Sequence, residues 1–172
     1  MNAMRYADTQ VVFREVPGEI TLAVNIAGCP FRCAGCHSPW LQEDRGEPLD
    51  EDALLALVAE NDGVTCVALM GGDADAPAVE RLLAAVKAAF PGMKTCWYSG
   101  GTMEAAREAA GHGAVDYLKV GPYVAALGPL DNPATNQRMY RITMTPDRKG
   151  AEDVSFEDIT PLFWQRSIDK KN

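Results

Sequence analysis

Short apolar runs alternate with amphipathic segments along most of the chain. Four runs are almost continuously apolar, which is typical of strands that are covered on both faces. The segments between them carry apolar residues at helical spacing, and capping or breaking residues mark their ends. The predicted strands are 19–27, 64–70, 95–98 and 115–120, and the predicted helices run from the Asp50 cap to Asn61, from Asp75 to Phe90 and from Met103 to Ala110.

Strands that alternate with helices indicate parallel βαβ units with right-handed crossovers. A full eight-fold barrel takes about 250 residues, so a chain of this length has room for about five to six βα units. The chain has 172 residues. We therefore predict an α/β fold of the partial, open TIM-like barrel type, with an open flavodoxin-like sheet as the alternative.

Two weaker strands are expected over 10–13 and 138–143, and they complete a predicted barrel domain at residues 1–145. Residues 146–172 are polar and acidic, and they have no apolar run of comparable length. We expect them to form a tail whose only anchor is a docking helix over 159–164.

Three of the five cysteines lie within eight residues, directly after the first confident strand, in the spacing Cys-x3-Cys-x2-Cys. These residues are Cys29, Cys33 and Cys36. A structural zinc site would need a fourth ligand, and His37 is adjacent to Cys36, which is poor geometry for chelating the same ion. A 4Fe–4S cluster held by three cysteines keeps one iron free for a small molecule. The spacing therefore favours an iron–sulfur cluster over zinc or a disulfide.

Charge and composition exclude several other classes of protein. The net charge is −8, which argues against a nucleic-acid or anionic-membrane partner, because both need clustered Lys and Arg. No apolar segment approaches the roughly 18 residues that span a bilayer, and the first residues carry no signal-peptide core. We expect a reducing cytoplasm, where cysteines are more often metal ligands or core residues than disulfides. Cys66 and Cys96 lie in the middle of apolar strands and are predicted to be core.

The other chemically suggestive residues follow the ends of predicted strands. Gly72 and Asp73 follow the second confident strand, Ser99 follows the third, and Lys119 ends the fourth. In parallel α/β folds the carboxyl ends of the strands share one rim, where ligands bind. The cysteine loop and these residues are therefore expected on the same rim.

The cysteine spacing is the signature of the radical S-adenosylmethionine (SAM) superfamily. The surrounding residues resemble, more narrowly, the activating proteins of anaerobic ribonucleotide reductases, over roughly residues 4–143. Two segments depart from that resemblance: residues 13–19 near the N-terminus and the tail after Thr143. The resemblance rests on Ala27-Gly28-Cys29, Cys36-His37-Ser38-Pro39, Met70-Gly71-Gly72-Asp73, Trp97-Tyr98-Ser99-Gly100, Val115-Asp116 and Thr135-Asn136-Gln137-Arg138.

The resemblance implies that the three cysteines bind one 4Fe–4S cluster and that the fourth iron chelates SAM. An electron from an external reductant then cleaves SAM to methionine and a 5′-deoxyadenosyl radical. In the activating family this radical abstracts hydrogen from a backbone glycine of the large subunit of anaerobic ribonucleoside-triphosphate reductase. The residues expected to contact SAM are Gly35, His37, Gly72, Asp73, Ser99 and Lys119.

Two alternatives remain open on the sequence. One is a radical SAM enzyme that acts on another glycyl-radical enzyme or on a small molecule. The other is a non-catalytic iron–sulfur electron-transfer module or a zinc-binding module. An electron carrier does not need Gly71-Gly72-Asp73 on the rim of its cluster, which favours the enzyme.

Overall fold

A computed structural model describes residues 3–146 and 152–168. Within these residues, eight strands form one open sheet in the order β3-β1-β2-β4-β5-β6-β7-β8. The elements are β1 (Arg5–Val12), β2 (Thr21–Ile26), η1 (Pro39–Gln42), β3 (Glu47–Pro48), α1 (Glu51–Ala59), β4 (Cys66–Met70), η2 (Asp73–Asp75), α2 (Ala76–Ala89), β5 (Lys94–Tyr98), α3 (Met103–Ala110), β6 (Tyr117–Val120), β7 (Arg138–Pro146), β8 (Glu152–Asp158) and α4 (Pro161–Ile168).

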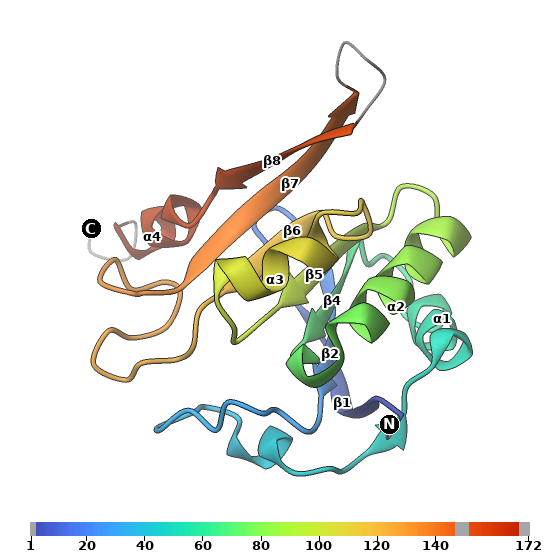
Figure 1. Ribbon diagram of the computed structural model, residues 1–172, viewed down its shortest axis with the longest axis horizontal. Helices are drawn as coiled ribbons and strands as arrows, with labels where there is room; N and C mark the ends of the chain where they lie inside the picture. The colour runs from blue at the N-terminus through green and yellow to red at the C-terminus, as the bar shows by residue number, and fades with distance from the viewer. Residues whose placement is uncertain (1–2, 147–151, 169–172) are drawn as a thin grey trace.

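The centre of the sheet is parallel, and its margins are antiparallel. β2, β4, β5 and β6 run parallel to one another, whereas β1, β7 and β8 pair antiparallel with their neighbours. The parallel strands follow one another in chain order, and α1, α2 and α3 lie side by side along them (Figure 1). A flavodoxin-like sheet would reverse its strand order. The predicted mixed α/β class and open sheet are confirmed, and the order does not reverse.

The expected number of βα units is too high. Helices connect only the four parallel strands in the described part of the chain, because β6 leads into β7 through the loop 121–137 and β7 pairs with β8. β8 was not predicted from the sequence. Its residues are mostly acidic, and only Val154 and Phe156 pack against the helix-side core. Two apolar positions in seven residues give too weak an alternation to distinguish an edge strand from a tail.

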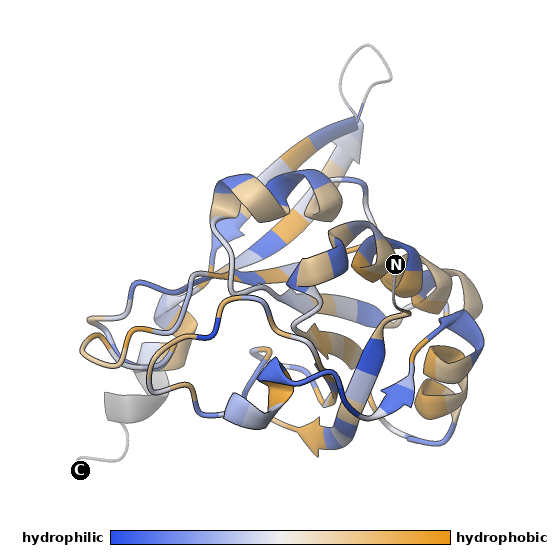
Figure 2. Ribbon diagram, turned by 60° about the horizontal axis from the view of Figure 1, so that its bottom comes forward, coloured by the Kyte–Doolittle hydropathy of each residue, from blue (hydrophilic) through white to orange (hydrophobic). Residues whose placement is uncertain are grey.

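The sheet carries an apolar core on each face. One core packs α1, α2 and α3 against β2, β4, β5 and β6. The opposite face is covered without those helices, by Val16 from the β1–β2 connection, Leu130 from the loop 121–137 and Ile159 before α4. Figure 2 shows helices that carry both hydrophobic and hydrophilic residues, as expected for helices with one buried side.

Cys66 and Cys96 belong to the second core and are fully buried, as predicted. Burial raises the pKa of both thiols well above the ordinary value. A neutral buried thiol behaves as a small hydrophobic group. Both residues are therefore structural.

Side-chain caps explain where two helices begin. Asp50 Oδ1 accepts a hydrogen bond from Ala53 N at 2.9 Å, and Asp75 Oδ1 accepts one from Ala78 N at 3.1 Å. Each carboxylate satisfies a backbone donor that the first helical turn leaves free. The capping role predicted for Asp50 is confirmed. In the described ranges, no helix combines the length and apolar character needed to cross a membrane.

Replacing Gly72 with alanine tests the turn that joins β4 to α2. Gly72 has a φ of +92°, and a Cβ there would lie 2.6 Å from Val79 Cγ2. We expect Gly72→Ala to lower the free energy of unfolding by about 2 kcal/mol or more, measured by urea denaturation. Gly63→Ala is the control, since its φ is +84° but no atom lies within 4 Å of the added Cβ. Equal losses in both variants would contradict a role for the Val79 contact.

Candidate iron–sulfur site

The strand register brings the predicted rim together. Met70 pairs with Tyr98, and Tyr98 pairs with Lys119, so the three residues form one row across β4, β5 and β6. Residues in one row of a parallel sheet point to the same face. Met70 and Tyr98 pack against the core on the face opposite the helices, so Lys119 also points to that face, at the carboxyl edge of the sheet.

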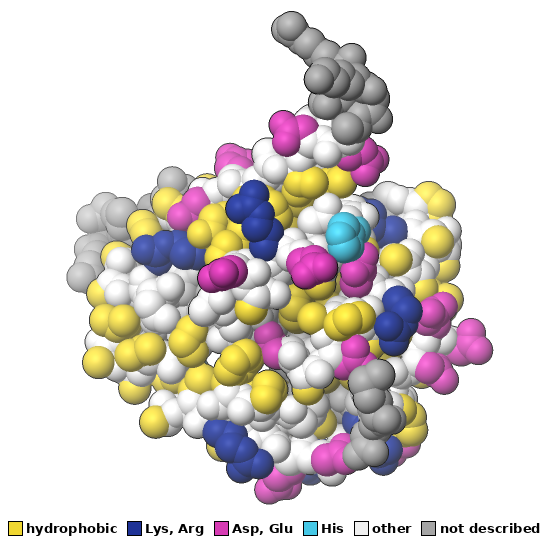
Figure 3. Space-filling view, viewed as in Figure 1, with side chains coloured by type: hydrophobic (Ala, Val, Ile, Leu, Met, Phe, Trp, Pro, Cys, Tyr) yellow, Lys and Arg dark blue, Asp and Glu magenta, His cyan; other side chains and the backbone are white. Residues whose placement is uncertain are grey.

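A cavity of about 290 Å³ opens at this edge. Figure 3 shows hydrophobic side chains over the same edge, where the cysteine loop and the loop 121–137 lie. Of the nine predicted site residues, seven line this cavity, which we call the cluster cavity. They are Cys29, Cys33, Cys36, His37, Asp73, Ser99 and Lys119.

The two predicted glycines do not line the cluster cavity. Gly35 has a φ of +73°, and a Cβ there would face Ala125 Cβ at 3.5 Å and Tyr123 Cε1 at 3.8 Å. The missing side chain of Gly72 faces Val79 and Met4. Both glycines shape the backbone next to the cavity: Gly35 in the cysteine loop and Gly72 in the turn before Asp73.

Asp73 is held between the ends of β4 and β5. Its carboxylate accepts a hydrogen bond from the Ser99 hydroxyl and another from Gly100 N at 3.2 Å. Trp97 Nε1 donates to Gly71 O at 2.9 Å and holds the turn that carries Asp73. Each carboxylate oxygen has a second lone pair, so a positioned Asp73 can also accept from a ligand ammonium group.

Lys119 brings a buried positive charge to the cluster cavity. It is 8% exposed, and its Nζ donates to Ser99 O at 3.3 Å and to Gly121 O at 2.7 Å. Burial lowers the pKa of Lys119 to about 8, whereas the negative charges of Asp73, Cys33 and Cys29 act to raise it. An ammonium group has three N–H donors, so one remains available for an anionic group in the cavity.

Backbone hydrogen bonds close the neck of the cysteine loop. Gly28 N donates to Glu43 O at 3.1 Å, and Cys29 N donates to Leu41 O at 2.9 Å. At the far side of the loop, the Phe31 ring packs against Gly100 so closely that a Cβ on Gly100 would lie 2.7 Å from Phe31 Cδ2. The loop is therefore docked on the end of β5 and directs its cysteines into the cavity.

The donor set fits an iron–sulfur cluster. Three thiols from one loop line one cavity, and thiolates are the usual ligands of iron–sulfur clusters. Ser38 N donates to Cys36 Sγ at 3.4 Å, which stabilises negative charge on that sulfur. Within residues 3–146 and 152–168, no three His, Cys, Asp or Glu side chains lie close enough together to hold a single metal ion.

Several cavity residues lie outside the set of site residues predicted from the sequence. Phe31, Met70, Tyr98, Tyr123 and Gln137 all line the cluster cavity. The position of Tyr98 beside Lys119 follows from the strand register, which a sequence pattern does not specify. Tyr123 comes from the loop 121–137, and its ring packs against His37 with a centroid distance of 4.7 Å.

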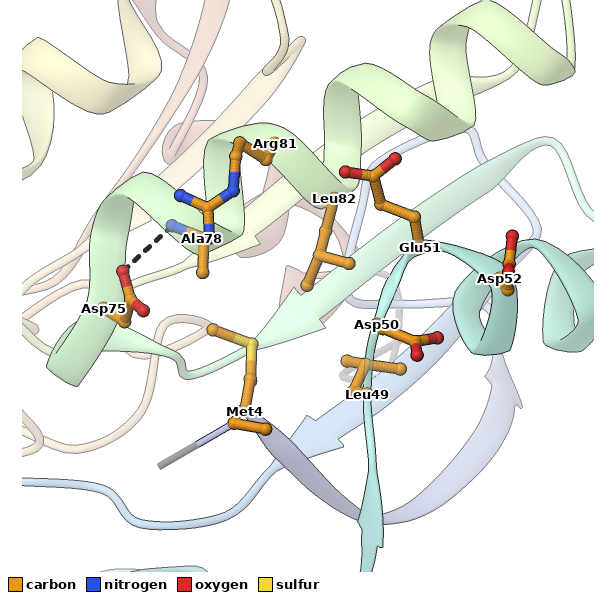
Figure 4. Close-up of a pocket in the computed structure, with 10 residues that line it drawn as sticks. Met4, Leu49, Asp50, Glu51, Asp52, Asp75, Ala78, Arg81 and Leu82 are labelled. Carbon is orange, nitrogen blue, oxygen red and sulfur yellow. Dashed lines mark hydrogen bonds between the residues drawn. The ribbon is translucent and has the colours of Figure 1, made fainter. Parts of the chain in front are cut away.

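A larger cavity of about 510 Å³ lies elsewhere, between the starts of α1 and α2 (Figure 4). Its lining includes Asp50 and Asp75 together with Arg81. The two aspartates are the helix caps described above, and Figure 4 shows the bond from Asp75 to Ala78. Asp50 and Asp75 thus have a structural role at this cavity, and the cysteines do not line it.

An open α/β sheet with three cysteines at its carboxyl edge defines a protein of the iron–sulfur class. Residues 17–141 match the model of a family described as a 4Fe-4S single cluster domain, and the chain belongs to this family. The match is compatible with the radical SAM superfamily. Comparison with curated proteins and with solved structures found no significant match. The prediction of a 4Fe–4S cluster is confirmed at the level of the family.

Alanine variants of the five cysteines test which of them hold iron. We expect Cys29→Ala, Cys33→Ala and Cys36→Ala each to abolish cluster binding, because the three thiols line one cavity and are the predicted ligand set. Cys66→Ala and Cys96→Ala should keep the cluster, since both side chains are buried in the core of the sheet. Iron content and visible absorbance after anaerobic reconstitution measure the outcome. Equal iron loss in all five variants would contradict the ligand assignment.

Proposed function

We propose that the protein is a radical SAM activating enzyme that generates a glycyl radical on the large subunit of an anaerobic ribonucleoside-triphosphate reductase. One observation carries this proposal: the cysteine loop and the residues at three successive strand ends line the same cavity. A module that only transfers electrons or holds zinc has no need for a polar ligand site beside its metal.

Cys29, Cys33 and Cys36 would hold the 4Fe–4S cluster. When bound there, such a cluster would supply the electron for reductive cleavage of SAM to methionine and a 5′-deoxyadenosyl radical. The protein contributes orientation and the exclusion of water. An external one-electron reductant would supply the electron.

The polar side chains of the cavity suit the methionine part of SAM. Asp73 offers a fixed carboxylate to the ammonium group, and Lys119 offers its remaining N–H to the carboxylate group. The two charges come from adjacent regions of one rim, so they can bind a zwitterion and orient it. Ser99 keeps Asp73 in place through its hydroxyl. His37 packs on Tyr123 and forms part of the cavity wall.

The fold supports this function in a further respect. We propose that the open sheet is a partial TIM-like barrel of the radical SAM type. In support, the parallel strands follow chain order, and α1, α2 and α3 pack on one face. An incomplete barrel leaves room for a protein substrate to reach the cavity. We further propose that the enzyme acts in the cytoplasm and binds neither nucleic acid nor membrane, consistent with its net charge of −8.

Formation of 5′-deoxyadenosine tests the radical chemistry. We expect the anaerobically reconstituted protein to produce it when SAM and dithionite are added. Adding the reductase subunit should then give a glycyl-radical signal in electron paramagnetic resonance. Absence of 5′-deoxyadenosine would overturn both radical hypotheses. Cleavage of SAM without a signal on the reductase would favour another glycyl-radical enzyme or a small molecule as substrate.

A lysine variant tests whether Lys119 binds SAM. We expect Lys119→Met to raise the KM for SAM by about tenfold or more, because a charge-assisted hydrogen bond contributes roughly 1.5–3 kcal/mol. Lys94→Met is the matched control: Lys94 is exposed at the opposite end of β5. A change in iron content without a change in KM would assign Lys119 to the cluster instead of SAM.

A further inference from the structure

A second cavity of about 540 Å³ adjoins the cluster cavity. We call it the side cavity. It lies on the sheet face opposite α1, α2 and α3, between the β1–β2 connection and α4. The two cavities share a wall of six residues, so a molecule in the side cavity would border the cluster directly. These residues are His37, Ser38, Met70, Tyr98, Pro129 and Gln137.

The first wall of the side cavity is anchored in the core. Arg14, Glu15 and Pro17 line the cavity from the β1–β2 connection. Between them, Val16 is fully buried. Glu15 O accepts a hydrogen bond from the Tyr98 hydroxyl. This connection is therefore fixed on the sheet and forms a stable side of the cavity.

The opposite wall comes from α4 and is also anchored. Ile159, just before the helix, is 4% exposed. The Thr160 hydroxyl accepts a hydrogen bond from Met139 N at 2.9 Å, and Trp164 Nε1 donates to Leu130 O at 3.3 Å. Leu162 and Phe163 then line the cavity. The sequence predicted a tail anchored by a docking helix over 159–164; in the structure the helix is α4, which packs on the sheet and lines the side cavity.

The charges that line the side cavity disfavour a phosphorylated ligand. Arg14 is the one full cation among the lining residues, and Glu15 and Asp131 contribute two carboxylates. A nucleotide or another phosphate ester is favoured by cationic side chains, and here the carboxylates outnumber the arginine. Apart from these charged groups, the lining is largely apolar, with Met70 and Leu130 among its members. Such a lining suits an uncharged or weakly basic ligand that has both apolar and polar groups.

A polypeptide segment has this chemistry. Its main chain offers alternating donors and acceptors, and the amide of Gln137, which is 6% exposed in the shared wall, can pair with either kind. Leu162, at 37% exposed, and Phe13, at 63% exposed and adjacent to Arg14, add apolar surface near the two walls.

We propose that the side cavity binds an extended segment of the protein substrate and that Leu162 of α4 and Arg14 of the β1–β2 connection contact it from opposite walls. The proposal rests on the proposed function, because the segment is the one presented to the cluster cavity. The two walls lie in the two stretches where the sequence departs from the activating proteins that it resembles. They therefore determine which partner is accepted, whereas the rim determines the chemistry.

Binding of the isolated large subunit of the anaerobic reductase from the same organism tests this proposal. Affinity for the cluster-reconstituted protein is measured anaerobically by calorimetry. We expect Leu162→Ser and Arg14→Glu each to weaken binding about tenfold or more, as truncation of a contact residue does. Val11→Ser is the matched control for Leu162→Ser, since Val11 is 41% exposed and lines neither cavity. It should bind like the wild type.

The same variants separate the proposal from the proposed function. Formation of 5′-deoxyadenosine without the partner should stay at the wild-type rate in all three variants, because the replaced side chains lie outside the cluster cavity. Failure of the wild type to cleave SAM would refute the proposed function and leave the binding result valid. Unchanged affinity in Leu162→Ser and Arg14→Glu, no binding by the wild type, or displacement of the subunit by ATP at the side cavity would each overturn the proposal.

Discussion

The hydrogen-bonded register of four parallel strands is the constraint on which the site depends. Neighbouring strands pair until their carboxyl ends, and two bonds continue the ladder beyond them: Gly71 N to Tyr98 O at 2.9 Å and Ser99 N to Lys119 O at 2.8 Å. A shift of one residue would turn each side chain to the other face of the sheet. Lys119 would then point toward the helices, away from the cavity. The register thus brings the candidate site residues of four separate segments to one rim.

The two faces of the sheet serve different purposes. The face under α1, α2 and α3 is a continuous apolar core, which fixes the strands. The other face has a smaller core, supplied by connections and by the segment that leads into α4. Because these segments cover the face incompletely, two adjoining cavities remain at its carboxyl end. An open sheet with one partly covered face can therefore combine a stable scaffold with access for a large partner.

Electrostatics at the rim follow from the same geometry. An overall net charge of −8 would disfavour an anionic ligand at an average surface position. Lys119 places a positive charge in the cluster cavity, where an anionic group is therefore favoured. Its ammonium group interacts electrostatically with Asp73 and two of the cysteines. A buried cation beside three thiolates also offsets the negative charge of the ligand set. In the function proposed above, this one lysine would serve both ligand binding and charge balance.

Much of the scaffold was predictable from local patterns. Continuous apolar runs identified β2, β4, β5 and β6, and the range predicted for α3 matches the helix in the structure. The spacing of Cys29, Cys33 and Cys36 identified an iron–sulfur family, because ligand spacing on one loop is a local property. Local signals also placed the Asp50 cap, which depends only on residues within one helical turn.

Other features were decided by tertiary structure. β8 forms because an acidic segment completes the hydrogen bonds of β7 and places the Phe156 ring under Arg107, whose Cζ lies 4.8 Å from the ring centroid. Neither contact can be read from the sequence of β8 alone. The antiparallel direction of β7 reflects a loop, not a helix, after β6. Tyr98 and Tyr123 reach the cavity through strand register and loop folding. The sequence determined which candidate ligand residues the chain carries. Long-range packing decided which of them meet, because contacts between distant segments depend on the whole chain.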